Sequence, residues 1–82
     1  MSYKVLFSNQ AKKFFKSLEN IFQERLKKKF EEIANDPLRY VEHYEGDYFK
    51  IRIGEFRALV DLDQKNKIIF IRVFDKRGRI YK

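Results

Sequence analysis

The spacing of the apolar residues changes once along the chain, at Asn35-Asp36-Pro37. Before this point, apolar side chains recur every three or four residues, which is the spacing of one face of an α-helix. After it, they alternate with polar side chains or run together, which is typical of β-strands. Pro37, the single proline, marks the boundary because a proline cannot continue the interior of a helix. The sequence therefore predicts a mainly helical first part and a β second part.

A short strand and two helices are expected before the boundary. Residues 3–7 favour a strand, and Ser8 follows as a helix cap, because its hydroxyl can accept a hydrogen bond from a free backbone N–H. The stripe of the first helix consists of Ala11, Phe14, Phe15 and Leu18. The second helix spans about residues 20–35 and begins with Asn20 and Gln23, which resemble a capping box. Because the linker is so short, the two helices should form a hairpin that presents both stripes to one sheet.

Three strands are expected after the boundary. They cover residues 48–53, 56–62 and 67–74. The first two are joined by Gly54-Glu55, and residues 40–47 are interpreted as a polar aromatic connector that ends in a turn. The order β-α-α-β-β-β in a single domain of residues 1–82 predicts an α+β fold. In this fold the helical hairpin packs on one face of a mainly antiparallel four-stranded sheet.

The chain is basic, with 19 Lys and Arg against 12 Asp and Glu and a net charge of +7. Polyanions or an acidic protein are therefore the first candidate partners, although many small soluble domains are also basic. The chain has no cysteine and one histidine, which excludes a cysteine zinc site and a thiol nucleophile, so we expect neither metal nor other cofactor. It also lacks an apolar stretch of about 20 residues, so we expect a cytoplasmic protein without membrane contact.

A row of basic and aromatic side chains is expected on the sheet face that the helices leave open. Alternation along residues 48–53 places Tyr48, Lys50 and Arg52 on that face, with the two cations about 7 Å apart. Arg57 follows just past the turn, and antiparallel pairing can bring the tail after the last strand beside it. Additional candidate RNA-binding residues are Lys27 and Lys28 on the second helix, and Lys76 and Arg79 near the C-terminus.

This set of side chains suits cleavage of an RNA phosphodiester. The reaction requires a deprotonated 2′-oxygen, a stabilised negative charge on the phosphate and a protonated 5′-oxygen leaving group. Arginine keeps its proton and acts as a charged donor, whereas a lysine among other cations, or Tyr81, is the better base. A simpler interpretation also exists, because any solvent-facing strand carries lysine and arginine, and Arg57 can pair with Glu55 or Asp61.

The stretches from Tyr48 to Arg57 and from Phe70 to Arg77, followed by Tyr81, resemble the RelE/ParE toxin superfamily, and its RelE branch in particular. The resemblance covers nearly the whole chain, because Phe14-Phe15-Lys16-Ser17-Leu18 and the lysine-rich second helix are similar to the family's helical hairpin. It implies a type II toxin that cuts mRNA in the ribosomal A site without a metal, by 2′-oxygen attack that leaves a 2′,3′-cyclic phosphate. The residues that it assigns to this reaction are Lys50, Arg52, Arg57, Arg77 and Tyr81.

The resemblance also implies partners. A RelB-like antitoxin would neutralise a monomeric toxin unit within a complex, and the targets would be ribosomal RNA and mRNA. The chain departs from the best-known member of the family at Arg52, where that member has a second lysine, and in its shorter spacing before Tyr81. The identity of the general base is therefore open.

Two other functions remain open from the sequence. A ParE-like toxin shares the fold but inhibits DNA gyrase and is not expected to need the basic set. A decayed toxin or non-catalytic RNA-binding domain would keep the charge without the chemistry. The combination of Lys50, Arg57 and Arg77 favours the nuclease.

Overall fold

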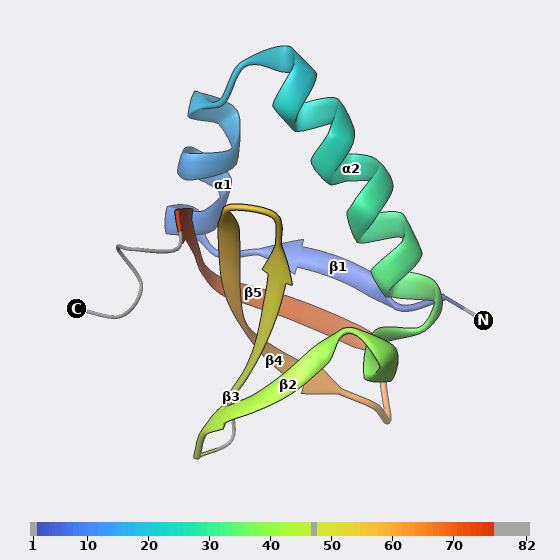
Figure 1. Cartoon of the computed structure of the whole chain (residues 1–82). Coiled ribbons are helices and arrows are strands. Elements are labelled where there is room, and N and C mark those ends of the chain that lie inside the picture. The colour runs from blue at the N-terminus through green and yellow to red at the C-terminus, as the bar shows by residue number, and fades with distance from the viewer. Residues whose placement is uncertain (1, 47, 77–82) are drawn as a thin grey trace.

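Two helices lie over one face of a five-stranded sheet (Figure 1). The computed structural model describes residues 2–46 and 48–76. The elements are β1 (Lys4–Phe7), α1 (Asn9–Ser17), α2 (Asn20–Asn35), the 3-10 turn η1 (Pro37–Arg39), β2 (Val41–Glu45), β3 (Tyr48–Ile53), β4 (Phe56–Asp63) and β5 (Ile68–Lys76). The predicted α+β fold with a helical hairpin on a mainly antiparallel sheet is confirmed.

The strands lie in the order β1-β5-β4-β3-β2. The last four strands of the chain form an antiparallel meander, and β1 pairs in parallel with β5 at one edge. A two-residue turn joins β3 to β4, and Gly54 adopts a φ of +58° there, as the first central residue of a type II′ hairpin turn does. This turn sets the register in which Ile53 lies opposite Phe56.

The predicted number of strands is wrong, because the sheet has five strands and not four. The additional strand is β2, which lies in the segment interpreted as a connector. It pairs with β3, so that Val41 lies opposite Ile51 and His43 opposite Phe49. The segment lacks a regular alternation of apolar and polar residues, and as an edge strand it has a single neighbour. Val41 packs against the core, but Glu42 and His43 are exposed, so backbone pairing with β3 is what defines this strand.

Of the two helix caps that the sequence predicts, one is present and the other is not. Ser8 caps α1, because its hydroxyl accepts a hydrogen bond from the Ala11 N–H at 3.1 Å. The capping box predicted at the start of α2 is wrong: the capping residue is Glu19, and no side chain caps this end. The amide of Gln23 instead donates to the Leu18 carbonyl at 2.8 Å and stabilises the short link between the helices.

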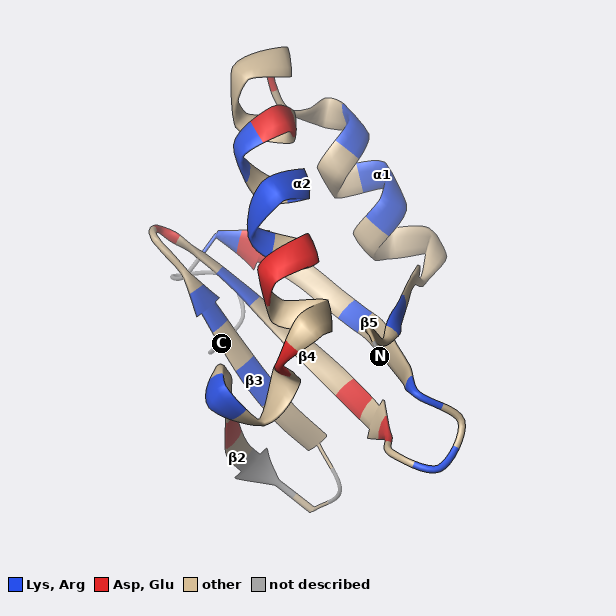
Figure 2. Cartoon of the chain, turned by 90° about the vertical axis from the view of Figure 1, so that its right-hand side faces the viewer, with Lys and Arg blue, Asp and Glu red and all other residues tan. Residues whose placement is uncertain are grey.

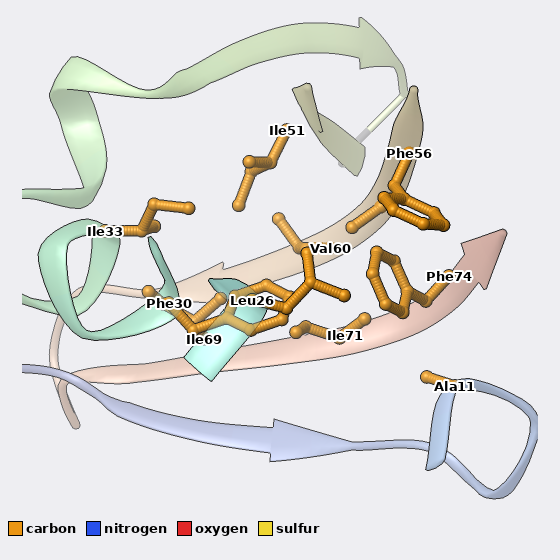
Figure 3. Close-up of a cluster of buried hydrophobic side chains, with 11 residues drawn as sticks. Ala11, Leu26, Phe30, Ile33, Ile51, Phe56, Val60, Ile69, Ile71 and Phe74 are labelled. Carbon is orange, nitrogen blue, oxygen red and sulfur yellow. The ribbon is translucent and has the colours of Figure 1, made fainter. Parts of the chain in front are cut away.

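An aromatic-rich core fills the space between the helices and the sheet (Figure 3). Phe74 has no exposed surface, and its ring contacts those of Phe14, Phe30 and Phe56 at centroid distances of 5.3 to 5.8 Å. The buried core residues are Ala11, Leu26, Phe30, Ile33, Ile51, Phe56, Ala58, Val60, Ile69, Ile71 and Phe74. Because side chains alternate along a strand, the residues between these positions in β3 to β5 point away from the helices.

β5 extends beyond the end of its neighbour β1. There, side chains at the start of α1 form hydrogen bonds with the backbone of β5 in place of a neighbouring strand. The last paired residue of β1 is Phe7, opposite Ile71. Beyond it, the Gln10 amide donates to the Phe74 carbonyl and its carbonyl oxygen accepts from the Phe74 N–H, both at 3.0 Å. The hydroxyl of Ser8 also donates to the Arg72 carbonyl. The final residues of β5 are thus attached to the start of α1.

Replacing Gln10 with Ala is expected to lower the free energy of unfolding by about 1 to 2 kcal/mol, because two hydrogen bonds to the backbone of β5 are lost. The loss should be local, so the Phe74 amide hydrogen should exchange with solvent faster. Hydrogen exchange measured by NMR checks this, with Asn9→Ala on the same exposed helix turn as the control. Equal protection of the Phe74 amide in Gln10→Ala and the wild type would contradict the role of Gln10.

Candidate functional site

The candidate site lies on the sheet face opposite the helices, called here the open face. Ile51, Ala58 and Phe74 lie in register across β3, β4 and β5, and all three are in the core beneath the helices. By alternation, Lys50 and Arg52 point to the other side of the sheet. Figure 2 shows basic residues along β3 as well as along both helices. The open face thus carries the cations of β3 beside the apolar residues Leu59 and Val73, which lie in register with Lys50.

The register brings three of the predicted catalytic residues together. Arg52 of β3 lies directly opposite Arg57 of β4, and Lys50 is two residues from Arg52 on the same strand. Asp75 of β5 lies opposite Arg57 on its other side. Arg52 is exposed and Lys50 half-buried, whereas Arg57 is only 5% exposed. Lys50, Arg57 and Asp75 each have an interaction partner in the structure. We call Lys50, Arg52 and Arg57 the basic row.

The pairing of Arg52 with Arg57 places two cations directly opposite each other on neighbouring strands. Like charges in such a pair are destabilising, by up to about 1 kcal/mol. Asp75, in register with Arg57, supplies one opposite charge for the two arginines. Glu42 of β2 lies opposite Lys50 in the same way. The three cations of the row thus face two carboxylates in register, and an anion bound at the open face would neutralise the remaining positive charge.

The other predicted residues do not join this row. Lys27 and Lys28 are exposed on α2, which packs on the opposite face of the sheet. Lys76 lies opposite the buried Phe56 at the end of β5, so it does not share the face of Arg57. Arg77, Arg79 and Tyr81 lie outside the described residues.

A second cluster on the open face was not predicted. The guanidinium carbon of Arg72 lies 5.6 Å from the centre of the Tyr48 ring and 5.4 Å from that of Phe70, and its Nε pairs with the Asp61 carboxylate. Alternation already places Tyr48 beside Lys50. Arg72 could not be placed from the sequence, because it is the extra residue of a β-bulge in β5.

Acidic residues occupy the end of the open face nearest the β4–β5 turn. Asp61 and Asp63 are two residues apart on β4 and share one face. The side-chain amide and backbone N–H of Asn66 donate to the Asp63 carboxylate at 2.8 and 3.0 Å and lower the pKa of Asp63 below its ordinary value. The open face thus carries Lys50, Arg52 and Arg57 toward the β3–β4 turn, and Asp61, which is paired with Arg72, and Asp63 toward the β4–β5 turn, which itself contains Lys65 and Lys67.

Two apolar pockets in the described part of the molecule lie away from the basic row. One, of about 540 Å³, lies between β1 and the helices and is lined by Val5, Phe15 and Phe30 among others. The other, of about 440 Å³, lies between α2 and the β3–β4 turn. Neither is lined by Lys50, Arg52 or Arg57, so the basic row is not part of these cavities.

Two further features concern only the part of the chain that the structure describes. Within residues 2–46 and 48–76, no cluster of three or more His, Asp or Glu side chains is arranged to hold a metal ion. No helix in these ranges has both the length and the apolar character needed to cross a bilayer.

Comparison with known proteins identifies a family for the sequence and relatives for the fold. Residues 5–80 match the family described as the ParE toxin of the type II toxin–antitoxin system, parDE. No curated protein matches the sequence.

Three solved structures share the fold. The chain is similar to the toxin–antitoxin complex RelBE2 from Mycobacterium tuberculosis, with a TM-score of 0.82 and 22% identity over 94% of this chain and 100% of that chain. It is similar to the RelE–RelB complex from Pyrococcus horikoshii OT3, with a TM-score of 0.76 and 24% identity over 96% and 99% of the two chains. The E. coli RelBE complex gives a TM-score of 0.76 and 23% identity over 95% and 100%.

Proposed function

Because this chain belongs to the ParE toxin family of the RelE/ParE superfamily, and is thus a toxin of a type II toxin–antitoxin system, we propose that it acts by cutting mRNA on the ribosome. The observation that supports this most is the basic row. Arg52 lies directly opposite Arg57, and such a pair of like charges is unfavourable by itself. A phosphodiester that approaches the open face gains charge-assisted hydrogen bonds from both.

Each residue of the basic row has its own role in the proposed reaction. Arg57, held in place by burial, contacts the phosphate, and Arg52 adds a second cation to the same anion. Both stabilise the charge that builds on the phosphate as the 2′-oxygen attacks. Lys50 stands two residues from Arg52 and is the candidate base within the described residues. Resemblance to RelE toxins gives Arg77 the role of protonating the 5′-oxygen and adds Tyr81 to the site. The products are a 2′,3′-cyclic phosphate and a 5′-hydroxyl.

The proposed partners follow from charge and from the solved relatives. Those relatives are complexes of RelE toxins with RelB antitoxins. A RelB-like antitoxin with acidic segments would complement the net charge of +7 and neutralise this toxin. Ribosomal RNA is the polyanion that would attract the free toxin to its mRNA target, and Lys27, Lys28, Lys76 and Arg79 are the cations proposed for this attraction. The toxin would act in the cytoplasm, where ribosomes translate.

A second candidate function is inhibition of DNA gyrase. The match to the ParE toxin family favours it, because ParE-like toxins share this fold. Gyrase inhibition would not depend on the charges of the basic row as phosphodiester cleavage does. The fate of mRNA therefore separates the two functions.

Incubation of the purified chain in parallel with a translating extract and with gyrase plus supercoiled DNA tests the proposal. We expect shortened mRNA in the extract and no trapped gyrase–DNA complex. Intact mRNA together with trapped gyrase–DNA complexes would overturn the proposal in favour of the second function. If neither effect occurs, the chain is a binding domain without either activity.

A further inference from the structure

Four side chains form a cluster on the open face beside the basic row. Tyr48 begins β3, Asp61 lies on β4, and Phe70 and Arg72 come from β5. The Asp61 carboxylate pairs with Nε of Arg72, whose guanidinium lies against the Tyr48 and Phe70 rings at 5.6 and 5.4 Å. One planar cation thus contacts two aromatic rings from different strands.

The cluster is ordered and yet open to solvent. Tyr48 is 40% exposed, and the Arg72 side chain is 49% exposed although it contacts three groups. The helices pack on the other face of the sheet (Figure 1), so no described helix covers these side chains. A ring and a guanidinium held in place in this way have already lost side-chain freedom, which lowers the entropic cost of binding a flat ligand.

The position of the cluster indicates what kind of flat ligand fits. Tyr48 and Lys50 are two residues apart on one face of β3, or about 7 Å along the strand. A stacking surface beside a cation suits the base and phosphate of one single-stranded nucleotide. The Asp61 carboxylate is paired with Arg72, whereas the Asp63 carboxylate lies toward the other end of the face and repels phosphate there. The backbone of the nucleic acid is therefore directed to the basic row, and its base to the rings.

We infer that Tyr48 and Arg72 form a platform on which an unpaired RNA base stacks while Lys50, Arg52 and Arg57 hold the neighbouring phosphate. The choice of RNA rests on the proposed function, whereas the stacking geometry does not. Every base has a π-face, so the platform should accept any base and contribute affinity more than sequence preference. Asp61 acts as a positioning residue, because its carboxylate holds the guanidinium against the rings.

Three variants separate stacking from general effects on the fold. Tyr48→Leu removes the ring, and Tyr48→Phe keeps the ring without the hydroxyl. Tyr40→Leu is the matched control, because Tyr40 also has a cation on its ring: the Lys29 ammonium of α2 lies 4.9 Å from its centre. The probe is a short single-stranded RNA whose only base is one 2-aminopurine, with abasic nucleotides elsewhere, and its fluorescence falls on stacking. A second RNA of equal length is abasic throughout.

In low salt, the wild type and Tyr48→Phe should bind the probe equally and quench its fluorescence. Tyr48→Leu should bind it about tenfold more weakly without quenching, and should bind the abasic RNA as the wild type does. Tyr40→Leu should resemble the wild type. The inference is overturned if Tyr48→Leu quenches normally, if Tyr40→Leu loses binding to the same extent, or if the wild type does not bind the probe.

The cleavage assay in the translating extract reports on the proposed function separately. Quenching that depends on Tyr48, combined with intact mRNA, would support the platform and refute the nuclease. Cut mRNA combined with quenching that is independent of Tyr48 would support the nuclease and refute the platform.

Discussion

Replacing Arg52 with Ala is expected to lower the rate of mRNA cleavage by about 100-fold without loss of stability. The loss of activity follows because a charged donor to the phosphate is removed, and one such donor contributes about 10²- to 10³-fold to a rate. Stability should hold or rise by about 0.5 kcal/mol, because the removal relieves the repulsion between Arg52 and Arg57. Activity and stability thus change in opposite directions, as is common where a site carries strain for function.

Cleavage rates in a translating extract and thermal unfolding measure the two effects of this substitution. The Tm should stay unchanged or rise by about 2 to 4 °C. Arg25→Ala is the matched control, because Arg25 is an exposed arginine of α2 on the other layer, and its cleavage rate should equal that of the wild type. A lower Tm with an unchanged cleavage rate would show that Arg52 has a structural role only.

Replacing Phe74 with Ala is expected to lower the free energy of unfolding by about 3 to 5 kcal/mol. Phe74 is fully buried, and its ring contacts the rings of Phe14, Phe30 and Phe56, so truncation leaves a cavity at the centre of the aromatic core. A domain of this size has a total stability of roughly 5 to 15 kcal/mol, so a large share of it would be lost.

Urea unfolding of Phe74→Ala beside Phe70→Ala tests this prediction. Phe70 belongs to the same strand but is only half-buried, on the open face. Its removal should cost less than half as much, because no closed cavity forms. Equal losses in the two variants would contradict the assignment of the core to the helix-covered face.

The sequence was sufficient for the elements that repeat a regular spacing. The second helix is expected at residues 20–35 and found at Asn20–Asn35, and the strand expected at residues 48–53 is Tyr48–Ile53. β2 could not be predicted, because its hydrogen bonds with β3 depend on neighbours that are distant in sequence and not on a buried stripe. The capping box failed for a related reason, since Gln23 bonds with the preceding linker instead.

The basic row could be predicted from the alternation of side chains along the strands and from the geometry of the turn between β3 and β4. The two-residue turn at Gly54-Glu55 fixes the pairing of Arg52 with Arg57, so their proximity follows from local sequence. The position of Arg72 does not, because a bulge shifts the register of β5 between Ile71 and Val73. The contacts of Arg72 with Tyr48 and Phe70 therefore depend on the three-dimensional structure and not on local sequence.

The central claim is that the open face of the sheet cuts mRNA. Primer extension on mRNA from a translating extract tests it most directly, with the wild type, Lys50→Ala and Lys27→Ala compared. Lys50 belongs to the basic row, whereas Lys27 is an exposed lysine of α2 on the other layer. We expect new mRNA ends within codons for the wild type and for Lys27→Ala, and their loss in Lys50→Ala. Intact mRNA with the wild type, or unchanged cuts with Lys50→Ala, would contradict it.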